Sequence, residues 1–339
     1  MKYLYLLILF FLLSSCSSSK AEYSDLKTTS KEQSHTQKLD NTVAPPSWYT
    51  DTTYSNSADY LYGYGSSKNT KGAINNALAD ISSNLETTIS TQGKLNINAN
   101  NKSLDKQISE NISTSSRKVM FLGYKIINQK HLNGITYVLV SINVPILINS
   151  LKQAIIKKQN SQKVNEPRSD LDTLEFTQRL YSNTLYIKNA INTLELIDRN
   201  SDLSMYNQIY DKQLHTLNNI SKRIKIYFDD SNYPNFLYPP LKEFLQKIFI
   251  TTNNKSNANI LIKITNNKFD ESTDKLGNYI INTSIKVTIQ EPNTNKIITK
   301  NFDVQASSGY GRYETILKLK QNFADELVQS HNFLDQTSL

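Results

Sequence analysis

A short apolar run shortly before the chain's single cysteine limits how this protein can be stabilised. The run from Tyr3 to Leu13 is 11 residues long and follows Lys2. A membrane-spanning helix needs about 20 apolar residues, so the run fits the central part of a secretory signal. Cys16 is the only cysteine in the sequence. No disulfide can therefore form within the chain, and the fold must depend on buried apolar side chains.

Residues Leu13, Ser14, Ser15 and Cys16 resemble the lipobox of bacterial lipoproteins, in which a branched apolar residue and two small residues precede a lipidated cysteine. The resemblance implies cleavage after residue 15 and more than one acyl chain, such as palmitate, on Cys16. Two chains are enough for a stable membrane anchor. Inner-membrane lipoproteins often carry aspartate after the cysteine, and Ser17 stands here. The resemblance thus favours lipid anchoring in the outer membrane, on its periplasmic or surface face. The alternative is a secreted protein with a free thiol.

The segment that follows is polar and has almost no large apolar residue. Such a composition cannot bury enough apolar surface to order itself, so we expect a lipidated, disordered tether over residues 16–44 after a signal peptide at residues 1–15. The formal net charge of the chain is +8. Its basic residues are scattered rather than massed, which argues against nucleic acid as a partner.

Periodicity predicts an α+β domain over residues 45–148. Residues 60–65 alternate like a strand, with Tyr60, Tyr62 and Tyr64 on one face. Apolar residues at helical spacing predict a helix over residues 72–86. A strand over 89–97 and a weak helix over 104–112 follow. Strands over 119–129 and 135–144, joined by Asn133-Gly134, predict a hairpin.

Three short stretches of this domain resemble the LPP-twenty family of bacterial envelope lipoproteins. They are Pro46-Ser47-Trp48, Tyr62-Gly63-Tyr64-Gly65, and Gly72-Ala73 with Ala77, Leu78 and Ile81. Related domains occur at the start of the flagellar assembly protein T. The resemblance implies a small α+β domain in an envelope setting, and it implies no catalytic residues.

The middle of the chain, residues 149–222, predicts helices. Pro167 breaks the first helical pattern, and Asp170 can cap the next helix. Two antiparallel helices that bury their apolar stripes against each other form the simplest arrangement, and a coiled coil with another chain is the alternative. The stripes are Phe176, Leu180, Ile187, Ile191 and Leu194, and then Leu203, Tyr206, Tyr210, Leu214, Leu217 and Ile220.

Residues 223–339 predict a second α+β domain, in the order strand, helix, three strands, helix. Pro239-Pro240 marks the first turn of its first helix. This order is similar to that of the TolB amino-terminal domain. The sequence thus predicts an α+β protein in which two small helix-on-antiparallel-sheet domains are joined by a helical hairpin, after a lipoprotein signal and a disordered tether.

No set of residues in the sequence has the spacing of a catalytic, metal or cofactor site. Gly63-x-Gly65 lacks the third glycine of a dinucleotide fingerprint, because Lys68 stands there. None of the four histidines has a second ligand at metal-binding spacing. We therefore expect no catalytic residues, no metal, no cofactor and no enzymatic activity.

Aromatic residues are the most suggestive candidates for binding. Trp48, Tyr60, Tyr62 and Tyr64 are the kinds of side chain that are enriched at interfaces and that stack on sugars. The alternative is that these rings pack on neighbouring strands. We expect a non-catalytic binding or scaffold protein of the envelope, whose partner is an unidentified envelope protein or peptidoglycan. The alternatives are a structural part of a flagellar or other envelope assembly and an enzyme that acts on the cell wall.

Overall fold

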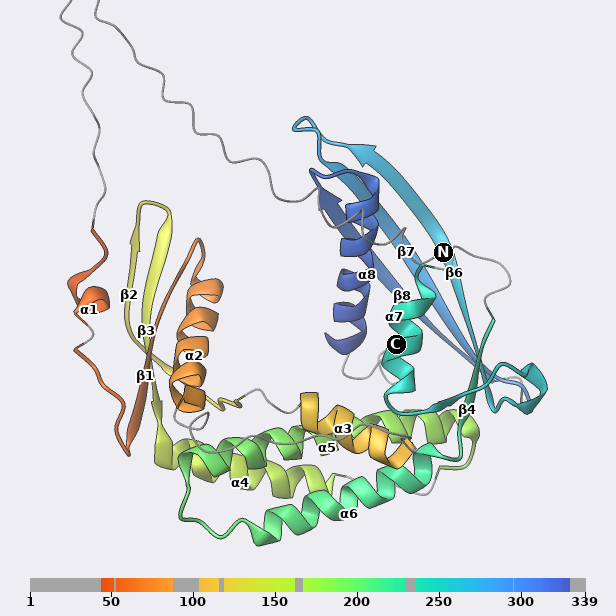
Figure 1. The fold of residues 1–339 in the computed structure, drawn as a ribbon, viewed down its shortest axis with the longest axis horizontal. Coiled ribbons are helices and arrows are strands. Elements are labelled where there is room, and N and C mark those ends of the chain that lie inside the picture. Colours follow the sequence, from red (N-terminus) through yellow and green to blue (C-terminus); the bar gives the residue numbers. More distant parts are fainter. Residues whose placement is uncertain are drawn as a thin grey trace, which may run out of the picture. The chain divides into compact units, whose positions relative to one another are not determined.

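The computed structural model describes residues 44–51, 53–87, 104–115, 119–161, 167–229, 236–294 and 296–329. The chain divides into two units, residues 1–43 and residues 44–339. Every described helix and strand belongs to the second unit (Figure 1). The predicted signal peptide, nearly all of the tether and the predicted strand over residues 89–97 lie outside the described residues.

The N-terminal part is a three-stranded antiparallel sheet with one long helix against it (Figure 1). The strand order is β1-β3-β2, and α2 packs on β1 and β3. Asn133 and Gly134 both have positive φ in the turn between β2 and β3, as the hairpin prediction requires. The elements are α1 (Ser47–Thr50), β1 (Tyr60–Ser67), α2 (Thr70–Thr87), α3 (Leu104–Ser115), β2 (Lys125–Leu132) and β3 (Ile135–Asn143).

One strand of this part is shorter than predicted. The sequence predicts a strand from residue 119, but β2 begins at Lys125. The preceding residues Met120, Phe121 and Leu122 pack instead against the buried residues of the N-terminal part, and the Met120 amide donates to Thr193 Oγ1 at 2.8 Å. These apolar residues are therefore used for contact with the middle helices rather than for strand pairing.

Three helices form the middle of the chain: α4 (Val144–Asn160), α5 (Asp170–Ile197) and α6 (Ser204–Ser221). The predicted break at Pro167 is confirmed, since α4 ends before it and α5 begins after it. The predicted cap was wrong by one position. The Ser169 hydroxyl accepts from the Asp172 amide, and Asp170 is the first helical residue. A serine hydroxyl in extended backbone makes this bond well.

We call α4, α5 and α6 the connector. Many of the side chains buried within it are polar. Helix α5 packs against α4, α6 and α3, so more of its circumference is buried than one apolar stripe covers. Thr177, Thr184 and Thr193 donate to the carbonyls four residues earlier, which satisfies their hydroxyls. The buried polar residues of α5 and α6 are Thr177, Gln178, Asn183, Thr184, Thr193, Gln213 and Ser221.

The C-terminal part is a five-stranded sheet of order β5-β4-β6-β7-β8, with α7 and α8 on one face (Figure 1). The sequence predicts an antiparallel sheet, and β6, β7 and β8 are antiparallel. Strand β4, however, pairs in parallel with β5 and β6. The elements are β4 (Lys225–Asp229), α7 (Tyr238–Gln246), β5 (Ile250–Thr251), the 3-10 turn η1 (Lys255–Asn257), β6 (Ile260–Thr273), β7 (Tyr279–Glu291), β8 (Lys296–Ser308) and α8 (Arg312–Gln329).

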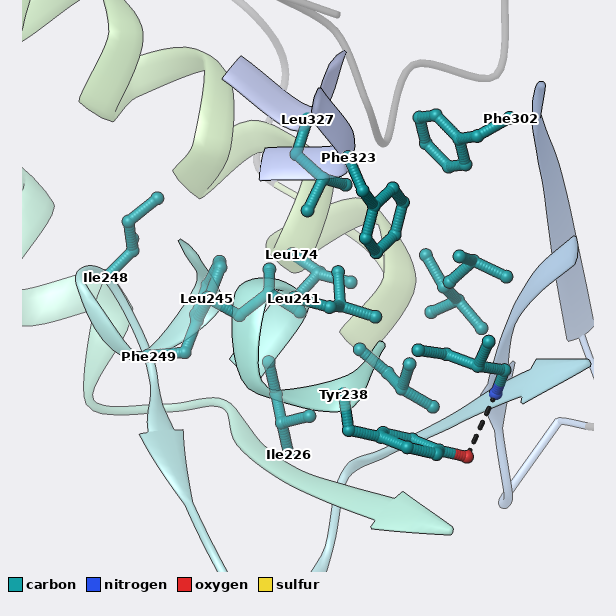
Figure 2. Packing of buried hydrophobic residues seen from close by; sticks show 14 of the residues in the cluster. Leu174, Ile226, Tyr238, Leu241, Leu245, Ile248, Phe249, Phe302, Phe323 and Leu327 are labelled. Carbon is teal, nitrogen blue, oxygen red and sulfur yellow. Dashed lines mark hydrogen bonds between the residues drawn. The ribbon is translucent and has the colours of Figure 1, made fainter. Parts of the chain in front are cut away.

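Tyr238 ties α7 to this sheet. Its hydroxyl donates to the Asp229 carbonyl at the end of β4, and it accepts from the Ile264 amide on β6 at 3.1 Å (Figure 2). Leu241 and Leu245 of α7 and Phe323 of α8 fill the space above the strands (Figure 2). The hydroxyl thus lets an otherwise apolar side chain bridge two parallel strands from within the core.

Two clusters of buried apolar residues stabilise the described part of the chain, and the connector contributes to both. The N-terminal core joins β1, α2 and β3 to α4, the second half of α5 and the start of α6. The C-terminal core joins β4, β6, β7, β8, α7 and α8 to α3, the first half of α5 and Leu217 of α6. The connector is therefore part of each core.

Candidate aromatic contact surface

The alternation of β1 places its tyrosines on the side of the sheet opposite α2. Leu61, Gly63 and Gly65 are buried toward α2, and Tyr60, Tyr62 and Tyr64 point the other way. A Cβ atom built on Gly63 would lie 2.1 Å from the Ala77 carbonyl oxygen, and one built on Gly65 would lie 2.1 Å from that of Ala73. The glycines therefore bring β1 against the helix, and the tyrosines are left for the outer face.

The outer face is partly covered by the chain that precedes β1. Tyr49 of α1 makes edge-to-face contacts with Tyr64, at 6.1 Å between ring centroids, and with Tyr137 of β3, at 4.9 Å. The Tyr64 hydroxyl accepts from the Tyr54 amide and donates to the Tyr54 carbonyl. Tyr64 is thus a packing residue, and it holds the preceding segment on the sheet.

The remaining rings are more open to solvent. Tyr60 is 42% exposed and Tyr54 is 39% exposed. The Tyr62 ring lies between them, with its centroid 6.2 Å from that of Tyr60 and 5.1 Å from that of Tyr54. Trp48 is half-buried, and its ring makes an edge contact with Tyr49 at 6.1 Å. We call this set the aromatic face: Trp48, Tyr49, Tyr54, Tyr60, Tyr62, Tyr64 and Tyr137.

The outer edge of β1 is closed by side chains. The Tyr62 amide donates to Asn56 Oδ1 at 2.7 Å, and the Tyr64 amide donates to Asp80 Oδ2 at 3.0 Å. Asn76 Nδ2 donates to the Ser66 carbonyl at 2.7 Å. These bonds occupy backbone groups that an added strand would need. This edge of the sheet is therefore poorly suited to pairing with an added strand.

Two lysines extend the aromatic face across β2. Lys125 pairs in register with Ser141, and Lys130 pairs with Tyr137. Directly paired residues share a face of the sheet, so both lysines point to the same side as the tyrosines. Both are exposed. The surface thus combines aromatic rings with positive charge.

The structure unites the three predicted tyrosines with Trp48 on one surface. Tyr137 belongs to the same face but was missed by sequence reasoning. The alternation of residues 135–144 places Tyr137 on the face of the strand away from Val138 and Val140. This pattern could have predicted its position on the outer face. The strand register was needed to bring it to Tyr49. Cys16, the predicted lipidation site, lies outside the described residues.

Within the described part of the chain, no three His, Cys, Asp or Glu side chains are grouped to hold a metal ion. His131 Nδ1 lies 3.0 Å from Thr136 Oγ1 on the neighbouring strand, and His215 contacts Asn219 one helical turn away. No helix among the described residues is long and apolar enough to cross a membrane.

Residues 46–143 match the model of the LPP20 lipoprotein family. The match begins one residue before α1 and ends with the last residue of β3, so it covers the three-stranded sheet, α2 and α3. The resemblance to this family is therefore confirmed over this range of the chain, and it supports an envelope lipoprotein. The similarity of residues 223–339 to the TolB amino-terminal domain stays a prediction.

The chain is similar to several solved structures, including the following three. The secreted protein HP1454 of Helicobacter pylori is 20% identical, with 80% of this chain and 97% of that chain covered and a TM-score of 0.28. Lipoprotein GNA1162 of Neisseria meningitidis is 10% identical, with 32% and 99% covered and a TM-score of 0.22. A minor lipoprotein of Acinetobacter baumannii is 16% identical, with 32% and 87% covered and a TM-score of 0.23. Among curated proteins, none matches the chain.

Proposed function

We propose that this protein is anchored in the outer membrane by lipid on Cys16 and that it binds another envelope component through the aromatic face. The observation that carries the proposal is the open group of Tyr54, Tyr60 and Tyr62 on the side of the sheet away from α2. Tyrosine supplies a large contact area with little loss of side-chain entropy, and it suits both protein and sugar surfaces. The closed edge of β1 supports recognition by side chains.

Anchoring makes a weak contact useful. A lipid anchor and a polar tether confine the folded part near one membrane, which raises the effective concentration for a partner on that membrane or on the wall beside it. Labelling cells with palmitate tests the anchor. The native chain should incorporate the label and sediment with outer membranes, whereas Cys16→Ser should remain unlabelled. Equal labelling of both chains would exclude Cys16 as the acylated residue.

Photo-crosslinking in intact cells tests the aromatic face. A photoreactive phenylalanine analogue is placed at position 60, and a matched control places it at Ile146 of α4, which is 63% exposed. Position 60 should capture one protein or peptidoglycan that position 146 does not. Adding Tyr62→Ser should lower the yield several-fold while cooperative thermal unfolding is kept. The same products from both positions would contradict the proposal, and a ladder of regularly spaced oligomers would favour an assembly subunit.

A further inference from the structure

The three most exposed large apolar side chains of the described residues lie at one end of the C-terminal sheet. Tyr310 is 90% exposed, Leu276 is 87% exposed and Tyr313 is 76% exposed. Leu276 lies in the turn between β6 and β7, and the other two lie where β8 turns into α8. Tyr279 pairs with Ser308 in register, so the two turns are neighbours (Figure 1). We call these three side chains the apolar tip.

The two turns are held in fixed positions. Arg312 binds the Glu271 carboxylate with Nε at 3.1 Å and Nη2 at 2.9 Å, which links the start of α8 to β6. The Tyr279 hydroxyl donates to the same carboxylate. The Arg312 hydrogen bonds hold the pKa of Glu271 below its usual value, so the pair stays ionised at neutral pH. These contacts fix the two turns that carry the apolar tip relative to each other.

Four backbone amides at the tip are paired within the turns. The Leu276 and Asn278 amides donate to Asp274 Oδ1 at 2.9 and 2.8 Å, and the Gly277 amide donates to the Asp274 carbonyl. The Tyr310 amide donates to Ser308 Oγ at 3.2 Å. Unpaired amides are costly in a medium without water, so this arrangement lowers the cost of moving the turns out of water.

The geometry points to a lipid surface as the occupant of the apolar tip. Two of the three side chains project from turns and the third from the first turn of α8, and all three are at least 76% exposed. A protein partner would need a pocket matched to each one, whereas lipid adapts to their shape. Leucine and tyrosine partition favourably into the interface of a bilayer. Lys275 is exposed on a flexible stem and can direct its ammonium group to the headgroups.

We propose that the apolar tip inserts into the headgroup region of the membrane and holds the C-terminal part at the bilayer. Three side chains bind weakly alone, so the contact rests on the proposed anchoring, which keeps the chain near the membrane. The charges of Glu271 and Arg312 cancel, as do those of Asp274 and Lys275, and these charged groups limit the depth to the headgroup level. The contact should therefore form on uncharged lipid and be insensitive to salt.

Fluorescence on vesicles tests this contact independently of acylation. The mature chain carries a hexahistidine tag in place of residues 1–16, and phosphatidylcholine vesicles with nickel-chelating lipid supply the tether. Since the native cysteine is absent, Leu276→Cys, Tyr310→Cys or Ile146→Cys can be labelled with an environment-sensitive dye. Dye at positions 276 and 310 should shift to the blue and be quenched by spin-labelled lipid, and dye at position 146 should do neither. Tyr310→Ser with Tyr313→Ser should lower quenching at position 276 several-fold.

The other outcomes overturn the proposal. Unquenched dye at positions 276 and 310 on tethered chains means that the tip stays in water. Equal quenching at all three positions means that the whole chain adsorbs without orientation. A blue shift that appears only after an envelope protein extract is added assigns the tip to a protein partner. Because the tag replaces Cys16, failure here leaves the palmitate result unaffected, and failure of labelling leaves this result unaffected.

Discussion

Gly63 and Gly65 have no room for any larger residue. Their neighbours are carbonyl oxygens of α2, which cannot move unless the helix moves. We expect Gly63→Ala or Gly65→Ala to lower the free energy of unfolding by about 2–4 kcal/mol, because a backbone contact must separate. Chemical denaturation monitored by tyrosine fluorescence measures the change.

The matched control for these variants is Gly309→Ala, whose added Cβ would meet only Asn278 Oδ1, at 3.2 Å. A flexible side chain can move by a few tenths of an ångström, so this change should cost less than about 0.5 kcal/mol. A large loss at residue 309 together with a small loss at residue 63 would contradict the packing role of the two glycines on β1.

At the scale of single residues, the sequence predicted which face each tyrosine occupies but not what each one does. Alternation alone put Tyr60, Tyr62 and Tyr64 on one side of β1, and this is confirmed. Alternation cannot separate Tyr64, whose hydroxyl is bonded to the Tyr54 backbone, from Tyr60, which is exposed. That difference depends on the positions of Tyr49 and Tyr54, which lie in a non-periodic segment whose path no sequence pattern predicts.

Helix α3 is the element whose role the sequence did not show. It lies within the LPP20-matching range, yet Ile108 and Ile112 are fully buried in the C-terminal core. Gln107 and Asn111 donate to the carbonyls of residues 246 and 247, where α7 ends, each at 3.3 Å. Lys222 pairs with Asp105 at 2.6 Å. A spacing of four predicted the helix, but no local pattern indicates which distant core it enters.

We therefore expect Ile108→Ala to weaken the C-terminal core. Removing three methylene-sized groups from a fully buried site should cost about 2–4 kcal/mol. Hydrogen exchange should show lost protection in α7 and β6, with β1 and β3 unchanged. The control is Ile81→Ala, an equally buried isoleucine of α2 that belongs to the N-terminal core. Loss of protection in β1 after Ile108→Ala would reverse the assignment of α3.

Across the described part of the chain, the order of the elements could be predicted from the sequence. The contribution of the connector helices to both hydrophobic cores could not. Strand and helix periods identified most of the longer elements of both sheets. The pairing of β4 between β5 and β6 required a parallel arrangement that strand patterns do not encode. Because buried residues of α5 and α6 complete the C-terminal core, we expect residues 223–339 to fold poorly without them.

A fragment of residues 167–339 should be more stable than a fragment of residues 223–339. The shorter fragment lacks the connector's buried members of the C-terminal core, and each such side chain contributes about 1.5–3 kcal/mol on burial. Their sum is similar to the whole stability of a typical domain. Calorimetry should therefore give a sharp transition for the longer fragment and a broad or absent one for the shorter. Equal transition temperatures for the two fragments would show that the connector adds no stability to the C-terminal core. The connector's members are Leu171, Leu174, Leu180, Tyr181 and Leu217.

The polar interior of the connector has a consequence for the response to temperature. Exposure of apolar surface raises the heat capacity of the unfolded chain, whereas exposure of polar surface lowers it. The threonines and amides buried in α5 and α6 therefore offset part of the increase that their apolar neighbours cause. Among the residues of β6 and β7 whose burial the structure describes, isoleucines predominate and fewer polar side chains are buried, so the offset there is smaller. The contribution of the helical middle to the free energy of unfolding should thus curve less with temperature than that of the sheet packed beside it.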